Sequence, residues 1–357
     1  MKIGVDYSSV VSGKTGIGVA AQNLIQAMKV TSPETEFILY HSGKGDLNTP
    51  KRIFWESVRL PLKASRDKLD LLYSPGFAPP MWSPAPSVVT VHDLIGMAYP
   101  GNQGAVSGFY WSKWLPAALG RSRRVVASSE HTRGDIVRFL KLTPEKVSVV
   151  PLAVDPAFKK TDDGAKTAAL LKKFGIRRSF FISVGTLEPR KNHLRLLEAY
   201  EILKQKKLNS FMLVIVGKPA AAEKEIKAFV RAKGLERDVI FLGYVELDEL
   251  ICLYNAALGY AITSLYEGFG LPVLEAMSCG LSGVCSNRSS LPEVAGNTAL
   301  MVEPDDAGQI AEALLRYSED SELRRSLSQK ALERASRFSM ERCARQMLGI
   351  FKDEIKK

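Results

Sequence analysis

The sequence predicts an α/β protein with two doubly wound, Rossmann-like domains. Three observations support this prediction. Short apolar runs of strand length alternate with amphipathic helical segments along most of the 357 residues, which is typical of parallel sheets covered by helices. The length corresponds to about two domains of ordinary size. The alternation pauses at Val154 to Asp163, which we interpret as the linker.

Composition excludes several classes of protein. With 46% hydrophobic and 24% charged residues, the chain is globular rather than disordered. It contains no apolar run near the roughly 18 residues of a membrane-spanning helix, and it begins with a strand-like segment, not a secretion signal. The four cysteines have no metal-like spacing and the four histidines do not cluster. We therefore expect a cytoplasmic protein without a metal site.

The net charge of +11 is concentrated in the first half of the chain. Residues 1–150 hold 18 Lys and Arg against 11 Asp and Glu. A basic excess can attract nucleic acid, anionic lipid or a phosphorylated substrate. The sequence contains no nucleic-acid-binding module, so we expect anionic membrane or a phosphorylated substrate as partner.

The first half shows the alternation of elements. Its proline-rich segment, Pro75 to Pro86, predicts an irregular loop. Ser129 is a candidate helix cap. Strands are expected at 3–6, 37–40, 71–73, 88–92, 125–128 and 147–151, with helices at about 16–28 and 132–140.

The segment from Val106 to Leu119 allows two interpretations. It carries Phe109, Tyr110, Trp111 and Trp114, and Arg121, Arg123 and Arg124 follow it. The simpler interpretation is a core helix followed by a solvated basic turn. Aromatic and basic side chains also suit a membrane interface, so the second is a patch resting on a membrane surface.

The second half repeats the pattern more regularly. We therefore expect an N-terminal Rossmann-like domain at 1–160, a C-terminal one at 161–338 and a final helix at 339–357. Strands are expected at 180–184, 212–217, 239–242, 260–262, 283–286 and 299–302, and helices near 192–206, 221–234, 247–257, 272–279, 306–317, 321–336 and 340–356.

The stretch from Ser264 to Gly280 carries the clearest functional signal. It reads as the end of a strand, a glycine loop and a helix that Pro272 opens and Gly280 closes. The free N–H groups of a helix start attract anions, whereas Glu267 and Glu275 suit hydroxyl groups. This combination fits a nucleotide sugar. The alternative is a plain tight turn followed by a glutamate that sits well in a first helical turn.

The two glutamates, with Gly-Phe-Gly-Leu-Pro between them, resemble the signature of retaining glycosyltransferases of family 4, which have the GT-B fold. The resemblance covers nearly the whole chain. It implies two domains facing a cleft and a final helix that crosses back to the first domain. It also implies that Glu267 holds hydroxyls of the donor sugar and Glu275 those of the ribose. The loop residues expected against the donor are Gly268, Phe269, Gly270 and Leu271.

The resemblance assigns further donor contacts in the second domain. Arg190 and Lys191 follow a strand end and would neutralise the diphosphate; the alternative is a polar loop in which Asn192 caps a helix. Many family members place the arginine directly after the glycine, where this chain has Thr186. Tyr244 and Val245 would line the nucleobase through their main chain.

The first domain is expected to contribute two segments. Gly16 and Gly18, between the first strand and the first helix, would border the donor phosphate and the acceptor. His92 would position the donor sugar, also through its carbonyl, although a lone histidine is more often structural. Further candidates are Asp93, which would orient the imidazole or cap a turn, and, on the acceptor side, Glu130 and His131.

The resemblance implies a reaction with retention and without an enzymic nucleophile or a metal, in which the leaving diphosphate takes the acceptor proton. The motifs look most like those of bacterial mannosyl- or rhamnosyltransferases of surface polysaccharide (lipopolysaccharide) synthesis. We therefore expect GDP-mannose as donor and a lipid-linked glycan as acceptor, with peripheral contact to the inner membrane face. The alternatives are a nucleotide-sugar epimerase of GT-B architecture, a transferase using a UDP- or dTDP-sugar and a soluble acceptor, and a non-catalytic binder.

Overall fold

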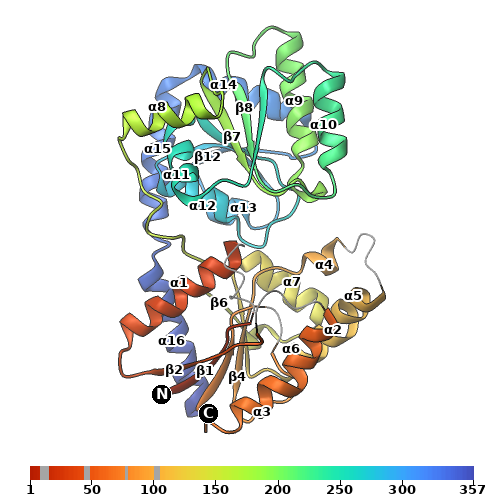
Figure 1. The fold of residues 1–357 in the computed structure, drawn as a ribbon, viewed down its shortest axis with the longest axis vertical. Coiled ribbons are helices and arrows are strands. Elements are labelled where there is room, and N and C mark those ends of the chain that lie inside the picture. The colour runs from red at the N-terminus through yellow and green to blue at the C-terminus, as the bar shows by residue number, and fades with distance from the viewer. Residues whose placement is uncertain (9–15, 44–48, 77–78, 100–104) are drawn as a thin grey trace. The chain divides into compact units, whose positions relative to one another are not determined.

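The computed structural model describes residues 1–8, 16–43, 49–76, 79–99 and 105–357. The chain divides into two compact units. Unit 1 comprises Met1–Asp155 together with Phe338–Lys357, and unit 2 comprises Pro156–Arg337. Each unit has a six-stranded sheet of parallel strands with helices packed around it (Figure 1). The sequence placed the boundary after residue 160 instead, because the segment between β6 and the next helix contains no regular element to mark it.

Unit 1 has the strand order β2-β1-β3-β4-β5-β6, so that β2 lies on the outer side of β1 and the other strands follow in sequence order. All its strand pairs are parallel. The strands are β1 (Lys2–Asp6), β2 (Glu36–Tyr40), β3 (Leu71–Ser74), β4 (Ser87–Val91), β5 (Arg124–Ala127) and β6 (Val147–Val149). The longer helices are α1 (Gly16–Thr31), α7 (Glu130–Leu140) and α16 (Met340–Lys356), with the short α4 (Ile95–Ala98) and the 3-10 turn η3 (Pro144–Lys146).

The C-terminal helix α16 completes the core of unit 1. It lies against α1 on one side of the first sheet (Figure 1). Its apolar face buries Met347, Leu348 and Phe351 among residues of β1, α1 and β3. The Phe351 ring lies 5.1 Å from that of Tyr73. The last 20 residues of the chain therefore belong to the fold of the first unit.

Two helical stretches of unit 1 are interrupted by π-helical turns, which the sequence did not reveal. One comprises α2 (Thr49–Phe54), η1 (Trp55–Arg59) and α3 (Leu60–Ala64), and the other α5 (Ala105–Phe109), η2 (Tyr110–Trp114) and α6 (Leu115–Arg121). The first was not predicted at all. In the second, Tyr110 is buried, and Trp111 and Trp114 pack against the core. The core interpretation is therefore confirmed for these three aromatic residues, while Phe109 is exposed.

Unit 2 has the strand order β12-β11-β10-β7-β8-β9, again with parallel pairs. The strands are β7 (Phe180–Val184), β8 (Met212–Val216), β9 (Val239–Gly243), β10 (Gly259–Ile262), β11 (Gly283–Ser286) and β12 (Ala299–Val302). The helices are α8 (Gly164–Lys173), the 3-10 turn η4 (Pro189–Lys191), α9 (His193–Gln205), α10 (Glu223–Ala232), α11 (Leu247–Ala256), α12 (Leu271–Ser278), α13 (Leu291–Ala295), α14 (Ala307–Glu319) and α15 (Ser321–Ala335).

The order of the strands creates a switch point in the second sheet. The chain runs outward from β7 through β8 to β9, and then returns to form β10 on the other side of β7. The loops that follow β7 and β10 therefore leave the sheet in opposite directions. In open α/β sheets, ligands bind at the carboxyl ends of the strands at such a point. This places the candidate site of unit 2 between the loop after Val184 and the loop after Ile262.

Candidate active site

The loops after β7 and β10 are connected directly by hydrogen bonds. Asn192 lies at the start of α9 with φ = 57° and donates from its amide to the carbonyls of Thr263 (3.2 Å) and Pro304 (2.7 Å). The N–H of Leu265 donates to the carbonyl of Arg190 at 2.8 Å. Asn192 occupies the cap position of α9, but its side chain does not cap the helix. It holds three strand-end loops together instead.

Glu267 lies at the centre of this junction. It is buried, and its Oε1 accepts from Lys191 Nζ at 2.5 Å and from Ser264 Oγ at 2.7 Å. Its Oε2 accepts from Arg190 Nη1 at 3.1 Å. Arg190 also donates from Nε to Glu188 at 2.8 Å. The structure therefore brings together the three charged residues that the sequence singled out on these two loops.

The charges of this cluster compensate one another. Burial opposes ionisation of Glu267, but the attraction of Lys191 and Arg190 and their hydrogen bonds hold its pKa below the ordinary value. A carboxylate this buried requires such pairing. Of the three ammonium hydrogens of Lys191, one is used on Glu267, and the other two have no acceptor among the described residues. Lys191 thus retains donor capacity for a further anion.

Glu275 occupies the second turn of α12 and is half-buried. Burial raises its pKa to about 7, although the hydrogen bond from Tyr254 and the charge of Lys191 oppose this rise. The Tyr254 hydroxyl lies 3.0 Å from Glu275 Oε2 and 3.3 Å from the carbonyl of Pro272. Tyr254 comes from α11 and is buried. It was not singled out from the sequence, because only the fold brings α11 beside α12.

The loop before α12 keeps its side chains inside the protein. Gly270 has φ = 103° at the start of α12, a conformation that favours glycine. Phe269 is only 4% exposed and Gly268 is buried. Leu271, the first residue of α12, is half-buried. A ligand at this helix start would therefore meet main chain rather than the Phe269 ring.

A serine pair positions the same loop from the other side. Ser289, which has φ = 55°, accepts from the N–H of Glu267 at 2.9 Å. Ser290 donates from Oγ to the carbonyl of Glu267 at 2.8 Å. Both serines follow β11, so the carboxyl end of a third strand contributes to the junction. The sequence did contain a signal for them, since two polar residues follow a buried strand.

His193 lies directly after Asn192 and is buried. Burial and the charge of Lys191 lower its pKa to about 4. The ring is thus neutral at physiological pH and adds no charge beside Lys191. This histidine was not identified as part of the site, because the sequence does not show that it is enclosed.

The loops after β7 and β8 approach each other so closely that only glycine fits. A Cβ added to Gly217 would lie 1.9 Å from the carbonyl oxygen of Gly185. Further along the same edge, Tyr244 is 57% exposed and Lys218 Nζ lies 5.0 Å from the centre of its ring. Val245 is buried. Of the two residues expected to line the nucleobase, only Tyr244 presents its side chain to the surface.

In unit 1, His92 lies at the carboxyl end of β4. It is buried, and burial lowers its pKa. Its Nε2 lies 2.8 Å from the carbonyl of Pro75. A carbonyl can only accept, so Nε2 carries the hydrogen of the neutral ring and the lone pair is on Nδ1. The carbonyl of His92 accepts from Ser128 Oγ (2.7 Å) and Thr132 Oγ1 (3.3 Å). Two hydroxyl groups of unit 1 thus engage this carbonyl, and its expected contact with a sugar stays a prediction.

The remaining candidates of unit 1 have structural partners. Asp93 accepts from the N–H of Ile95 at 3.0 Å, which supports its alternative interpretation as a turn cap. Glu130 pairs with Arg133 at 3.2 Å, and His131 Nε2 lies 3.4 Å from Asp135. Gly16 and Gly18 lie in the first turn of α1, and the preceding loop, residues 9–15, is outside the described residues.

The described residues contain no group of three or more His, Cys, Asp or Glu side chains that could hold a metal ion. In the same residues, no helix combines the length and the apolar character needed to cross a membrane. The four cysteines are buried and free.

Comparison with known proteins identifies the family. Residues 169–334 match the family described as Glycosyl transferases group 1, and residues 33–158 match Glycosyltransferase Family 4. The O-antigen chain mannosyltransferase B of Escherichia coli is 31% identical over 305 residues, which are 85% of this chain and 77% of that protein. The chain belongs to the group 1, family 4 glycosyltransferases.

Two further comparisons fit this family. The E. coli serotype-specific mannosyltransferase WbdA is 32% identical over 263 residues, which cover 72% of this glycosyltransferase but 32% of WbdA. The crystal structure of Anabaena HepE in complex with UDP-glucose matches this chain with a TM-score of 0.75 at 18% identity. The match covers 99% of this chain and 99% of HepE. The predicted GT-B fold with two Rossmann-like sheets is thus confirmed, and glycosyl transfer is the activity of the family.

Proposed function

We propose that this glycosyltransferase moves mannose from GDP-mannose, with retention of configuration, to a lipid-linked glycan during synthesis of a surface polysaccharide. The observation that carries the proposal is the junction of Lys191, Arg190 and Glu267 at the switch point of the second sheet. The matched relatives named above are mannosyltransferases, and one acts on the O-antigen chain. They favour mannose and a glycan acceptor.

In this proposal, the donor diphosphate lies beside Lys191 and the start of α12. Lys191 has donor capacity left beyond Glu267, and charge-assisted hydrogen bonds contribute about 1.5–3 kcal/mol each. Arg190 would exchange part of its pairing with Glu188 for the diphosphate. Glu275 would accept from the ribose hydroxyls, and Glu267 would meet the donor sugar. The acceptor proton would leave with the diphosphate, so the reaction would need no metal.

Nucleotide binding tests the donor assignment. Thermal shifts with GDP, UDP, ADP and dTDP would rank the bases, and we expect GDP to stabilise the protein most. Because ribose occurs in donor and product alike, Glu275→Ala should weaken GDP binding at least tenfold. Unchanged affinity of the Glu275→Ala variant for GDP would contradict the role of this carboxylate. Turnover that persists with a chelator would support metal independence, and strict dependence on manganese would refute it.

A second donor class has its own support. HepE binds UDP-glucose and has the same fold, and the resemblance assigns the base contacts at Tyr244 and Val245 to the main chain, which does not by itself specify guanine. A UDP- or dTDP-sugar is therefore the alternative donor. An epimerase is separated from both transferases by its products, since it would convert a nucleotide sugar without any acceptor present.

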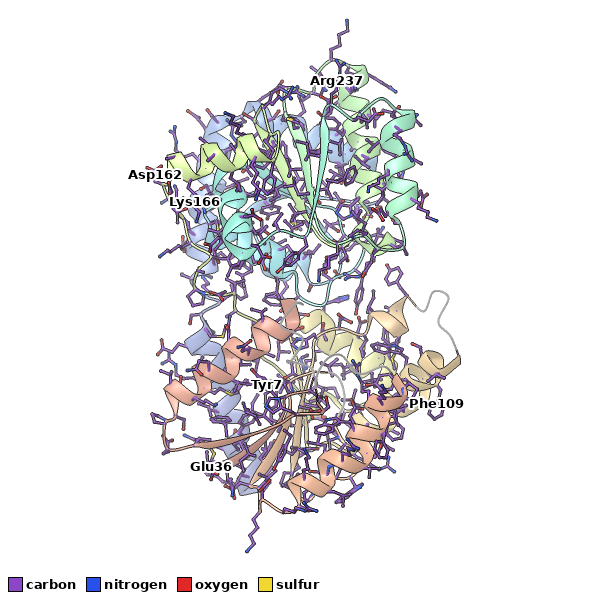
Figure 2. All side chains as sticks on the ribbon, in the orientation of Figure 1. Tyr7, Glu36, Phe109, Asp162, Lys166 and Arg237 are labelled. Carbon is purple, nitrogen blue, oxygen red and sulfur yellow. The ribbon has the colours of Figure 1, made fainter. Side chains whose placement is uncertain are left out.

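Contact with a membrane is supported by an apolar strip on unit 1 that the sequence did not reveal. Phe54, Val58 and Leu62 recur every four residues along α2, η1 and α3, and they are 52%, 39% and 52% exposed. Phe109, 54% exposed, extends from the neighbouring α5 at the outer side of unit 1 (Figure 2). Exposed basic residues flank the strip: Lys51, Arg59 and Lys63. Apolar and basic side chains together suit an anionic lipid surface.

Vesicle sedimentation tests this contact. We expect the protein to bind vesicles containing phosphatidylglycerol, and the double variant Phe54→Ser/Leu62→Ser to lose most of that binding. Val30→Ser is the matched control, because Val30 is 70% exposed on α1 and lies outside the strip. Equal binding by the double variant and the control would remove the strip from the proposal.

A further inference from the structure

A basic groove in unit 1 lies at the amino ends of the strands of the first sheet, whereas His92 lies at the carboxyl end of β4. It is lined by residues at or before the amino ends of three strands, namely Ser87 of β4, Arg124 of β5 and Lys146 before β6. Its volume is about 760 Å³, within the usual range for small-molecule sites. Because ligands of the family fold bind at the carboxyl ends of the strands, the groove is separate from the site described above.

The walls of the groove carry an excess of positive charge. Five cationic side chains face two carboxylates, those of Glu145 and Glu354. The cations are Arg121, Arg123, Arg124, Lys146 and Lys357. The groove also includes Trp82, which is 49% exposed. A concave surface with an excess of one sign of charge concentrates counter-ions.

Glu354 of α16 fixes three of these cations. Its side chain is 2% exposed and receives Arg124 at 2.9 and 2.6 Å, Arg123 at 3.4 Å and Lys357 at 3.0 Å. Burial raises the pKa of Glu354, but the hydrogen bonds from Lys357 and Arg124 outweigh this effect and hold it below its ordinary value. One carboxylate therefore orients three cations and neutralises only one of them.

Anchoring of α16 accounts for only part of this arrangement. Arg124 is 19% exposed, and its guanidinium is already engaged by Glu354 and by the carbonyl of Glu145. Arg123 remains 41% exposed, and Arg121 is exposed and donates only to the carbonyl of Ala117, without an ion pair among the described residues. Holding a helix in place does not require these two further guanidinium groups beside the same groove.

We propose that this groove binds a phosphate-bearing ligand. Guanidinium groups present parallel N–H donors that match phosphate oxygens in pairs. The exposed Trp82 ring offers an apolar surface to the part of the ligand that carries the phosphate. The groove is larger than phosphate alone needs, which favours a phosphate ester or diphosphate. This site is independent of the proposed donor and acceptor.

Calorimetric titration of the full chain with inorganic pyrophosphate tests the proposal. The donor site could also bind this probe, so three variants separate the two locations. Arg121→Ala removes an exposed groove cation without touching Glu354, and Arg121→Ala/Arg123→Ala removes two. Lys191→Ala reports on the donor site only. Arg345→Ala is the matched control, because Arg345 is 62% exposed on α16 and pairs with Glu341 outside the groove.

We expect one pyrophosphate site to weaken about tenfold in Arg121→Ala and further in the double variant. That site should be unchanged in Lys191→Ala and Arg345→Ala, and it should weaken with salt. Vesicles of phosphatidylglycerol, with phosphatidylcholine vesicles as reference, distinguish a lipid headgroup from a soluble ligand. If pyrophosphate displaces the protein from the phosphatidylglycerol vesicles, the groove binds the headgroup; if it does not, the ligand is soluble. The proposal is overturned if pyrophosphate does not bind the wild type, or if the groove variants bind it as the wild type does.

Discussion

At the scale of single residues, the site of unit 2 depends on carboxylates whose surroundings set their charge. Glu267 is kept ionised by two cations, whereas Glu275 is half-buried with one neutral donor, Tyr254, against it. The two glutamates that the sequence presents as a pair are therefore different chemical groups near pH 7. Burial raises the pKa of Glu275, whereas the charges of Lys191 and Arg190 outweigh the burial of Glu267.

Tyr254→Phe should shift the pH profile of nucleotide affinity to higher pH. In the proposed function, the ionised form of Glu275 accepts from the ribose hydroxyls, so affinity should rise as pH increases through about 7. Removal of the Tyr254 hydroxyl takes away a hydrogen bond that favours ionisation, and the midpoint of that rise should move upward. We expect severalfold weaker GDP binding at pH 7 and near recovery at pH 9, measured by titration calorimetry.

The control for this change is Tyr260→Phe. Tyr260 is also fully buried in unit 2, but its hydroxyl makes no hydrogen bond to Glu275. It should leave the midpoint where it is. A pH profile of Tyr254→Phe that overlays the wild type would show that Glu275 does not titrate in contact with the nucleotide.

Glu56→Gln should increase stability at alkaline pH. Burial and the negative charge of Asp6 raise the pKa of Glu56 well above 4.5, so the folded state holds a proton that the unfolded chain releases. Stability from this group is therefore complete below pH 4.5 and falls as pH rises, by up to about 1.4 kcal/mol per pH unit. Urea unfolding at pH 5 and 8.5 would measure it.

Relative to the wild type, the free energy of unfolding of the glutamine variant should be higher at pH 8.5 than at pH 5. Glu341→Gln, at a position 70% exposed on α16, should show no such gain. A variant less stable than the wild type by the same amount at both pH values would mean that Glu56 is ionised and paired in the folded state.

At the scale of elements, the sequence predicted the helices and strands that have one buried face. It failed where tertiary packing overrides the hydrophobic pattern. All the expected strands form, and Ser129 caps α7 as predicted. The stretch from Thr49 to Ala64 was missed because its exposed apolar strip and its π turn disturb the helical period. The loops that carry Lys191 and Glu267 follow their strands as predicted. Ser289 and Ser290, which bond to Glu267, and Tyr254, which bonds to Glu275, come from elements that the sequence did not connect with these glutamates.

Gly217→Ala should separate the loops after β7 and β8. The new methyl group would lie 1.9 Å from the carbonyl oxygen of Gly185, which is impossible without movement of the backbone that leads to Lys191. We expect nucleotide affinity to fall at least tenfold while circular dichroism stays that of the folded protein. Gly164→Ala is the control, since nothing lies within 4 Å of its added Cβ. Intact affinity in Gly217→Ala would indicate that this loop does not bind the nucleotide.

At the scale of the whole molecule, the two units have separate cores. The larger core of unit 2 gathers residues of β7, β8 and α14 among others, and none of them comes from unit 1. The core of unit 1 requires residues from both ends of the chain, because α16 lies beside β1 and β3. The chain therefore closes its first unit only after the second has been synthesised.

Phe351→Ala should destabilise unit 1 selectively. Phe351 is fully buried against Tyr73, and truncation of such a side chain costs about 3–5 kcal/mol. For a unit of this size, that cost corresponds to a lower unfolding temperature by roughly 10 °C. Phe211→Ala is the matched change in unit 2, where Phe211 is equally buried. Hydrogen exchange read separately for the two units should show lost protection in unit 1 for the first variant and in unit 2 for the second. Equal loss in both units for either variant would mean that the two cores unfold as one.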